Sequence, residues 1–289
     1  MVEQHSTLEN KQKANFIQLV EQCWQQQHFV CVGLDPEYER LPAVVKTSGN
    51  CEEAFFLFAR DIVDATHDLV CAYKPNSAFY EAQGADGLRA LSRIVSYIKE
   101  TYPAIPVILD AKRADIGNTN LGYAISAFDH LQADAITVHP YLGKEALQPL
   151  LARKDKGIIV LARTSNPGAG ELQDLLVGET QEPLYQVVAR NVARQWNTNG
   201  NCALVIGATY PDEMRKVREI VGDLPFLIPG IGAQGGDVAA TVQAGKDSRG
   251  WGMIINSSRG IIYASQESDF AAAARRATAQ LRDEINQYR

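Results

Sequence analysis

The stretch ILDAKRADIGNT, residues 108–119, contains the pattern from which the fold of this chain can be predicted. It continues the apolar run PVIL (106–109), which is typical of a buried strand. The run ends in four charged residues within six positions, namely Asp110, Lys112, Arg113 and Asp115. Charges next to a buried strand are costly unless they are paired or used. The stretch therefore predicts a strand whose carboxyl end carries a functional charge cluster.

Working outward, seven further apolar runs resemble PVILDAKR. All eight are rich in Val and Ile and nearly continuous in apolarity, as in strands that are buried on both faces. The eight runs span residues 29–36, 68–76, 106–113, 135–140, 157–166, 202–209, 225–232 and 252–260. Strands of this kind predict a parallel sheet.

Amphipathic helical patterns separate these runs. The clearest span residues 52–68, 87–102, 183–197 and 269–287. Strands that alternate with helices pair in parallel through right-handed crossovers. Eight such units without a break in composition favour a closed (β/α)₈ TIM barrel, an α/β fold, over an open doubly wound sheet. We expect one domain over residues 1–289, in which 1–28 form a helical extension whose helix, 7–27, covers the closed bottom.

Composition excludes several classes of protein. The 289 residues are 46% hydrophobic and carry a net charge of −6, which argues against nucleic acid or an anionic membrane as a partner. The polar N-terminus has no signal-peptide pattern, and no apolar run is long enough to span a bilayer. The five cysteines contain no CxxC pair and fit buried free thiols. We expect a cytoplasmic protein.

Nearly every predicted strand ends in a polar residue. These strand-end residues are Asp35, Lys74, Asp110, Lys112, His139, Ser165 and Asn256. In a parallel barrel the carboxyl ends of the strands and the loops after them form the active-site face. The repeated pattern therefore predicts a polar site at the mouth of the barrel.

The charged residues fit one array at this mouth. Residues i and i+2 of a strand point to the same side, so Asp110 and Lys112 project inward together. Lys74 ends the neighbouring strand, and Asp115 lies on the following loop. A salt-bridge network that only compensates its own burial is the alternative. A protonated lysine held between carboxylates indicates chemistry that expels a carboxylate and delivers a proton.

The stretch GIGAQGG (230–236) suggests a second part of the site. Its G-x-G-x-x-G spacing also occurs in dinucleotide-binding folds, but the next strand lacks the acidic residue that binds ribose there. Loops after the last two strands of barrels commonly bind phosphate, and Arg259 supplies a bidentate donor. A tight turn with a surface arginine is the other alternative. We expect a phosphorylated small molecule.

With these motifs the chain resembles the orotidine 5′-phosphate decarboxylase family, in its longer bacterial subfamily, often called type 2. DAKRADIGNT (110–119) matches D-x-K-x-x-D-I-x-x-T. The further matching motifs are GLDP (33–36), YKPN (73–76), ARTSNPG (162–168), PGIGAQGGD (229–237) and NSSRG (256–260). The resemblance implies a lyase that converts orotidine 5′-phosphate to uridine 5′-phosphate and CO₂, the last step of UMP biosynthesis.

The resemblance also implies a role for each motif residue. Lys112 would donate the proton to C6, Asp110 would lie against the substrate carboxylate, and Lys74 would bridge Asp110 and the ribose. The implied substrate-binding residues are Asp35 for the ribose, Ser165 for the pyrimidine amide edge, and Gly230, Gly232, Gln234 and Arg259 for the phosphate. Asp115 and Thr119 would reach across a homodimer interface to the partner's ribose, and Ile116 is counted with them.

No cofactor or metal is implied, and the five histidines lack a ligand spacing such as HxxxH. The segment 162–183 is long and contains Gly168, Gly170 and Gly178, which fits a closing lid. His139 stands where this subfamily is expected to have Asn, and we interpret it as a hydrogen-bonded residue rather than an acid. Arg113 has no assigned role beyond support of the site or an interface.

Two other functions stay open at this stage. A metal-dependent sugar-phosphate decarboxylase or aldolase of the same superfamily would share D-x-K-x-x-D but would need further carboxylate ligands. A non-catalytic nucleotide-binding barrel would keep the phosphate loop without needing the charged array.

Overall fold

The computed structural model describes residues 14–231 and 236–289 and contains a parallel sheet of eight strands. All eight predicted strands are present. Their bounds are β1 Val30–Gly33, β2 Val70–Lys74, β3 Ile108–Arg113, β4 Ala135–Val138, β5 Gly157–Arg163, β8 Cys202–Ile206, β9 Phe226–Pro229 and β10 Met253–Ser257. The two remaining short strands, β6 Leu176–Val177 and β7 Glu182–Pro183, form an antiparallel hairpin.

The sheet closes into a barrel. Its order is β2-β1-β10-β9-β8-β5-β4-β3, so successive strands of this sheet lie side by side, and β1 pairs with β10, the last strand. The outer strands β2 and β3 meet through two isolated parallel bridges, Tyr73 with Val107 and Asn76 with Asp110. The predicted (β/α)₈ TIM barrel is confirmed, and its sparsest pairing is the β2–β3 seam.

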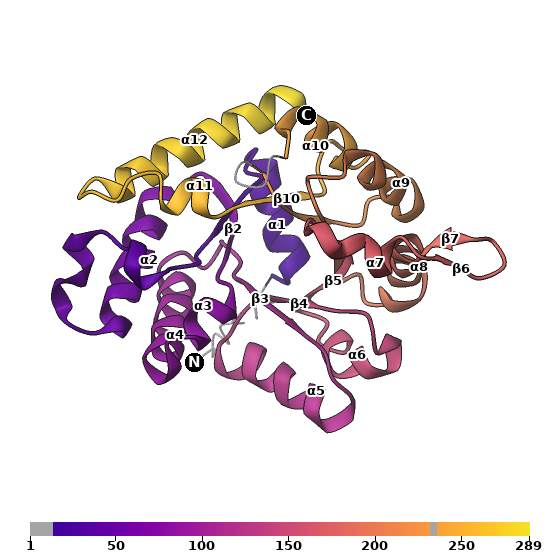
Figure 1. Cartoon of the computed structure of the whole chain (residues 1–289), viewed down its shortest axis with the longest axis horizontal. Helices are drawn as coiled ribbons and strands as arrows, with labels where there is room; N and C mark the ends of the chain where they lie inside the picture. The colour runs from indigo at the N-terminus through magenta and orange to yellow at the C-terminus, as the bar shows by residue number, and fades with distance from the viewer. Residues whose placement is uncertain (1–13, 232–235) are drawn as a thin grey trace, which may run out of the picture.

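Helices surround the barrel (Figure 1). They are α1 Phe16–Gln25, α2 Cys51–Thr66, α3 Ser77–Glu81, α4 Gly84–Thr101, α5 Gly117–Ala124, α6 Gly143–Leu151, α7 Gly170–Gln173, α8 Leu184–Asn191, α9 Pro211–Val221, α10 Val238–Gly245, α11 Arg259–Ile262 and α12 Phe270–Tyr288. Helices α5 and α8 continue into π-helical segments, Ile125–His130 and Val192–Trp196. The four predicted helical segments correspond to α2, α4, α8 with its extension, and α12.

Helix α1 lies at the amino ends of the strands. Its Trp24 indole donates a hydrogen bond of 2.8 Å to the carbonyl of Met253, the first residue of β10. Its Phe16 ring contacts Gly157 at the start of β5 so closely that a Cβ there would lie 2.2 Å from the ring. Helix α1 therefore covers the end of the barrel opposite the mouth. Residues 7–13 of the predicted helix lie outside the described residues.

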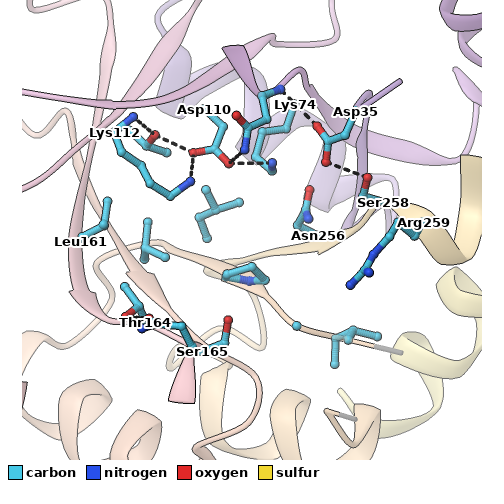
Figure 2. A pocket seen from close by; sticks show the side chains of 18 of the residues that line it. Asp35, Lys74, Asp110, Lys112, Leu161, Thr164, Ser165, Asn256, Ser258 and Arg259 are labelled. Atoms are coloured by element: carbon cyan, nitrogen blue, oxygen red, sulfur yellow. Dashed lines mark hydrogen bonds and ion pairs between the residues drawn. The ribbon is translucent and has the colours of Figure 1, made fainter. Parts of the chain in front are cut away.

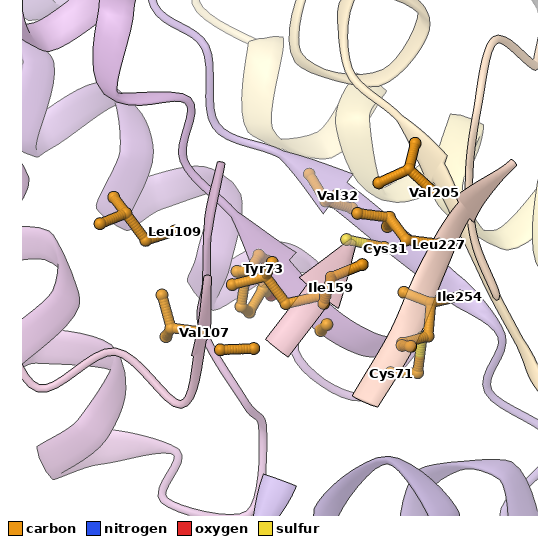
Figure 3. Close-up of a cluster of buried hydrophobic side chains, with 14 of the residues drawn as sticks. Cys31, Val32, Cys71, Tyr73, Val107, Leu109, Ile159, Val205, Leu227 and Ile254 are labelled. Atoms are coloured by element: carbon orange, nitrogen blue, oxygen red, sulfur yellow. The ribbon is translucent and has the colours of Figure 1, made fainter. Parts of the chain in front are cut away.

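The barrel interior is apolar below its mouth. Cys31, Cys71, Ile159, Leu227 and Ile254 gather between the strands (Figure 3), and each is almost fully buried. Burial disfavours the charged thiolate and raises the pKa of the Cys31 thiol to about 12. All five cysteines are free, but Cys51 on α2 is only partly buried, contrary to the prediction for all five.

Within residues 14–231 and 236–289, no helix combines the length and apolarity that a membrane span requires.

The contact of α1 with β10 gives a stability prediction. Trp24→Ala should lower the free energy of unfolding by about 3–5 kcal/mol, because it leaves a cavity under the barrel. Trp24→Phe keeps a ring and loses the hydrogen bond to Met253, so its loss should be only about 1–2 kcal/mol. Urea unfolding measures both. Equal losses in the two variants would contradict this account of the contact.

Candidate active site

A cavity of about 460 Å³ opens at the carboxyl ends of the strands. Figure 2 shows Lys112, Asp110, Lys74 and Asp35 along one wall, with Thr164 and Ser165 opposite. The predicted site residues that line it are Asp35, Lys74, Asp110, Lys112, Ser165, Gly230 and Arg259. The structure thus brings together most of the strand-end residues that the sequence singled out.

The centre of the wall is a carboxylate held between two lysines. Asp110 is 8% exposed, and its Oδ2 lies 3.0 Å from Nζ of Lys74, which is 4% exposed. Its Oδ1 lies 2.7 Å from Nζ of Lys112 and accepts a hydrogen bond of 2.8 Å from the Thr137 hydroxyl. Every strong interaction of Asp110 thus favours its ionised form.

These contacts shift the pKa values of the buried pair. Burial on its own would raise the pKa of Asp110, but Lys74, Lys112 and Thr137 outweigh it and hold this pKa well below its usual range. Burial would lower the pKa of Lys74, but the carboxylates of Asp110 and Asp35 outweigh it and raise this pKa. Both groups are therefore charged over the physiological pH range.

Lys112 reaches Asp110 through an irregularity in β3. The ladder with β4 pairs Leu109 with Ile136 and then Arg113 with Val138, so four residue steps on β3 match two on β4. Lys112 takes a left-handed conformation with φ of 47°, and its N–H donates to the Thr137 hydroxyl at 3.0 Å. A bulge, and not the simple alternation of a regular strand, therefore aims Lys112 at Asp110.

Asp35 forms a second anchored carboxylate. Its Oδ1 accepts a hydrogen bond of 3.1 Å from the N–H of Asn76, and its Oδ2 accepts one of 2.7 Å from the Ser258 hydroxyl. Ser258 can approach because residue 33 is glycine: a Cβ at Gly33 would lie 2.7 Å from the Ser258 Cβ. The strand ends of β1, β2 and β10 thus fix one carboxylate at the cavity wall.

Ser165 is positioned by a close backbone approach. A Cβ at Gly207, after β8, would lie 2.9 Å from both the Cβ and the N of Ser165. Next to it, Gln173 of α7 accepts from the N–H of Thr164 at 2.9 Å and donates to its hydroxyl at 2.8 Å. These two bonds lie within the segment 162–183 and hold α7 against the residue that follows β5, while lid movement stays a prediction.

The opposite end of the cavity suits an anion. Gly230 adopts φ of 107°, a conformation that favours glycine. Arg259 is exposed at the cavity, and among the described residues its guanidinium has no hydrogen-bond or ion-pair partner. Gly232 and Gln234, also predicted to bind phosphate, lie outside the described residues.

Three predicted residues do not line the cavity of their own chain. Asp115 accepts a hydrogen bond of 2.7 Å from the N–H of Ile116, which is 60% exposed. Thr119 is exposed on α5. They lie on the segment that follows β3, and none of them lines the cavity.

The two residues without firm roles also lie outside the cavity. Arg113 forms an ion pair with Glu81 of α3 and lies 5.3 Å from the centre of the Tyr123 ring. His139 donates its N–H to the Arg113 carbonyl at 3.2 Å. Its Nδ1 is buried with no partner among the described residues, so the hydrogen bonding expected of its side chain is not seen at that atom.

Sequence reasoning did not assign roles to several cavity residues. They are Asn76, Thr137, Thr164, Gln173, Asn256 and Ser258. Thr137 and Asn256 are polar residues near the ends of apolar runs, and Ser258 directly precedes Arg259. For these three residues the sequence pattern could have indicated a place at the cavity. Within the described ranges, no group of three or more His, Cys, Asp or Glu side chains could hold a metal ion.

Fold and cavity together define the class of this protein. It is a parallel α/β-barrel enzyme with Asp110 held between Lys74 and Lys112 at the mouth and, beside this array, a cavity end that suits an anion. The protein-family model described as "Orotidine 5′-phosphate decarboxylase / HUMPS family" matches residues 28–277, and the chain belongs to this family. The resemblance inferred from the motifs is confirmed.

Similar proteins cover the chain almost completely. The orotidine 5′-phosphate decarboxylases of Ralstonia nicotianae and Cellvibrio japonicus are 55% and 51% identical, covering 95% and 94% of this chain and 99% and 98% of their own. The Leishmania donovani OMP decarboxylase structure is 39% identical, with a TM-score of 0.81, and covers 94% of this chain and 99% of its own. The UMP synthase of the same organism is 41% identical, with a TM-score of 0.85; the match covers 96% of this chain and 56% of that chain.

The pKa of Asp110 gives a pH prediction. Asp110→Asn should lower the free energy of unfolding by about 3–5 kcal/mol at neutral pH, because Lys74 stays buried without its carboxylate. Since folding lowers the pKa of Asp110, this stabilisation is complete above the unfolded-state pKa of about 3.9 and is lost as the pH falls towards the folded-state pKa. The difference between the two proteins should be constant above about pH 5 and shrink below about pH 4.

Urea unfolding across this pH range measures the difference. The control is Asp212→Asn, since the Asp212 side chain is 80% exposed and its change should be small at every pH. A difference between wild type and Asp110→Asn that does not vary with pH would show that the charge of Asp110 is not what stabilises the array.

Proposed function

We propose that this protein decarboxylates orotidine 5′-phosphate to uridine 5′-phosphate and CO₂, the last step of de novo pyrimidine biosynthesis. The observation that carries the proposal is the buried Asp110 carboxylate held between the Lys74 and Lys112 side chains in a cavity that Gly230 and Arg259 also line. Family membership and the names of relatives that match over nearly their whole length support the same reaction.

The array suits loss of a carboxylate. The substrate carboxylate would lie against Asp110, and two negative charges in contact favour a transition state in which one of them is leaving as neutral CO₂. The bond between C6 and the carboxylate carbon breaks, and its electron pair stays at C6. Lys74 and Lys112 are already oriented beside this developing charge, so they stabilise it with little reorganisation.

Lys112 completes the reaction by proton transfer. Its ammonium gives a proton to the electron pair at C6, which yields the uridine product and a neutral amine. The Lys112 side chain is 49% exposed, so water can return a proton to the amine. Lys74 is nearly buried and keeps its charge, which suits the role of bridging Asp110 and the ribose.

The rest of the nucleotide would be held by neighbouring groups. Asp35 would accept hydrogen bonds from the ribose hydroxyls, and Ser165 would recognise the amide edge of the pyrimidine. Gly230, Gly232, Gln234 and Arg259 would bind the phosphate. Binding energy from this non-reacting group can support closure of segment 162–183 and orientation at C6.

We also propose a homodimer in which Asp115 and Thr119 complete the site of the partner, with Ile116 beside them. Exposed apolar side chains on the segments after β3 and β4 support an interface, because exposed apolar groups tend to gather at contact surfaces. These side chains are Ile116, Leu121, Ile125, Tyr141 and Leu142. We propose that residues 1–289 form one barrel domain with 1–28 as its extension; a cytoplasmic location stays a prediction.

The decisive variant is Lys112→Ala. It should lower turnover of orotidine 5′-phosphate by more than about 10⁴-fold, because it removes both the proton donor and one counter-charge. Binding of uridine 5′-phosphate should be largely retained. The fall in absorbance as substrate becomes product measures turnover, and Lys144→Ala, an exposed lysine of α6, is the control.

Near-normal turnover by Lys112→Ala would exclude Lys112 as the donor. Turnover by the wild type should persist in a metal chelator. Activity that a chelator abolishes, with turnover only of a sugar phosphate, would favour the metal-dependent alternative. Nucleotide binding without any turnover would favour a non-catalytic barrel.

Subunit mixing tests the shared site. Lys112→Ala and Asp115→Ala should each be nearly inactive alone. A mixed dimer contains one site in which both Lys112 and Asp115 are intact, so mixing should restore up to about half of the activity per mixed dimer. Subunit exchange is measured with two differently tagged chains. Exchange without any restored activity would show that Asp115 acts within its own chain.

A further inference from the structure

Asn256 at the end of β10 has a buried amide without a partner. Its side chain lines the cavity, and the residue is only 7% exposed. Oδ1 is fully buried with no hydrogen-bond partner, and no described residue receives a hydrogen bond from Nδ2. Leaving a buried polar group unpaired costs about 1–3 kcal/mol, so such a group in a folded protein requires a reason.

The fold does not supply this reason. The backbone of Asn256 pairs with Cys31 on β1 and with Pro229 on β9, and an apolar side chain would permit the same ladder. Asn120 and Asn201 are different, although each also has an unpaired Oδ1. Their amide nitrogens hold the chain together, since Asn120 donates to Ala146 at 2.6 Å and Asn201 to Arg153 and Lys156 at 3.1 and 3.0 Å.

The position of Asn256 limits what it can bind. Figure 2 shows it between the Lys74–Asp110 pair and Arg259, on the side of the cavity where Asp35 and Ser258 lie. The two ends of the cavity carry the charges that suit a carboxylate and a phosphate. A neutral amide between them suits an uncharged oxygen in the part of the ligand that joins these two groups.

We propose that Asn256 is a substrate-binding residue whose amide hydrogen-bonds an uncharged oxygen of the sugar of the bound nucleotide. This inference rests on the proposed function, because it takes the ligand to be a nucleoside monophosphate. Asp35 can only accept hydrogen bonds from sugar hydroxyls, whereas the amide of Asn256 can also donate. The two residues together would recognise the sugar through both kinds of hydrogen bond.

The test separates the sugar from the base and the phosphate. Affinities for uridine 5′-phosphate, ribose 5-phosphate and inorganic phosphate are measured by calorimetry for wild type, Asn256→Leu and Asn256→Ala. Both variants should lower the affinity for uridine 5′-phosphate and for ribose 5-phosphate about 3- to 10-fold, which corresponds to the loss of one neutral hydrogen bond. Their affinity for inorganic phosphate should stay unchanged. The melting temperature of ligand-free Asn256→Leu should equal or exceed that of wild type, because an unpaired polar group has been removed.

The matched control is Asn201→Leu, which loses two hydrogen bonds at the far end of the barrel. It should melt at a lower temperature and bind all three ligands as wild type does. Three results for the Asn256 variants would overturn the inference. The first is unchanged affinity for uridine 5′-phosphate, and the second is a loss of affinity for uridine 5′-phosphate but not for ribose 5-phosphate. The third is an equal loss of affinity for inorganic phosphate. The second would assign the amide to the base, and the third to the phosphate.

Failure of the inference and failure of the proposed function give different results. If the wild type turns over orotidine 5′-phosphate and the Asn256 variants bind the ligands unchanged, the inference about Asn256 is contradicted and the proposed function is not. If the wild type shows no turnover and the variants bind ribose 5-phosphate more weakly, the decarboxylase function is contradicted. Asn256 would then still be a sugar-binding residue.

Discussion

The contact between Lys74 and Asp110 is the interaction on which the site and the closed barrel both depend. Lys74 ends β2 and Asp110 lies on β3, and in the described part of the chain the backbone pairing at this seam consists of two isolated bridges. The ion pair therefore crosses the sparsest seam of the barrel at its mouth. Neither partner could be buried alone, because an unpaired charge in this position would cost several kcal/mol. Closure of the barrel thus brings the two charges together, and each compensates the burial of the other.

The second lysine depends on the same seam from the other side of β3. Lys112 occupies a left-handed conformation, which costs a residue with a Cβ about 1–2 kcal/mol and persists only where neighbours hold it. Inside, its N–H and Nζ are bound by Thr137 and Asp110. On the outer face of the barrel, Arg113 pairs with Glu81 on α3, the helix that follows β2 in the chain. Contacts on both faces of β3 therefore hold the bulge that presents Lys112 to the cavity.

This bulge also marks the limit of what the sequence could predict. Buried parallel strands are apolar throughout, so eight Val- and Ile-rich runs located every strand of the barrel, and the polar residues after them located the mouth. The short β6–β7 hairpin has no such run and was not predicted. A period of two predicted that Asp110 and Lys112 lie together, although the actual cause is irregular geometry that periodicity does not encode. Thr137 and Asn256 were not assigned because the role of a single polar residue in an apolar run depends on its neighbours across strands. The proposed contributions of Asp115 and Thr119 involve a second chain and cannot follow from one barrel.

The cavity residues divide into those that are already paired and those that are not. Asp110, Lys74, Lys112 and Asp35 are held by one another or by Thr137, Asn76 and Ser258 before any ligand binds. Among the described residues, Arg259 and the amide of Asn256 have no such partners. Groups that act on a developing charge are most effective when they are fixed in advance. Groups that bind the non-reacting part of a ligand gain most when the ligand supplies their missing partners, so this cavity separates preorganised chemistry from unsatisfied binding groups within one barrel mouth.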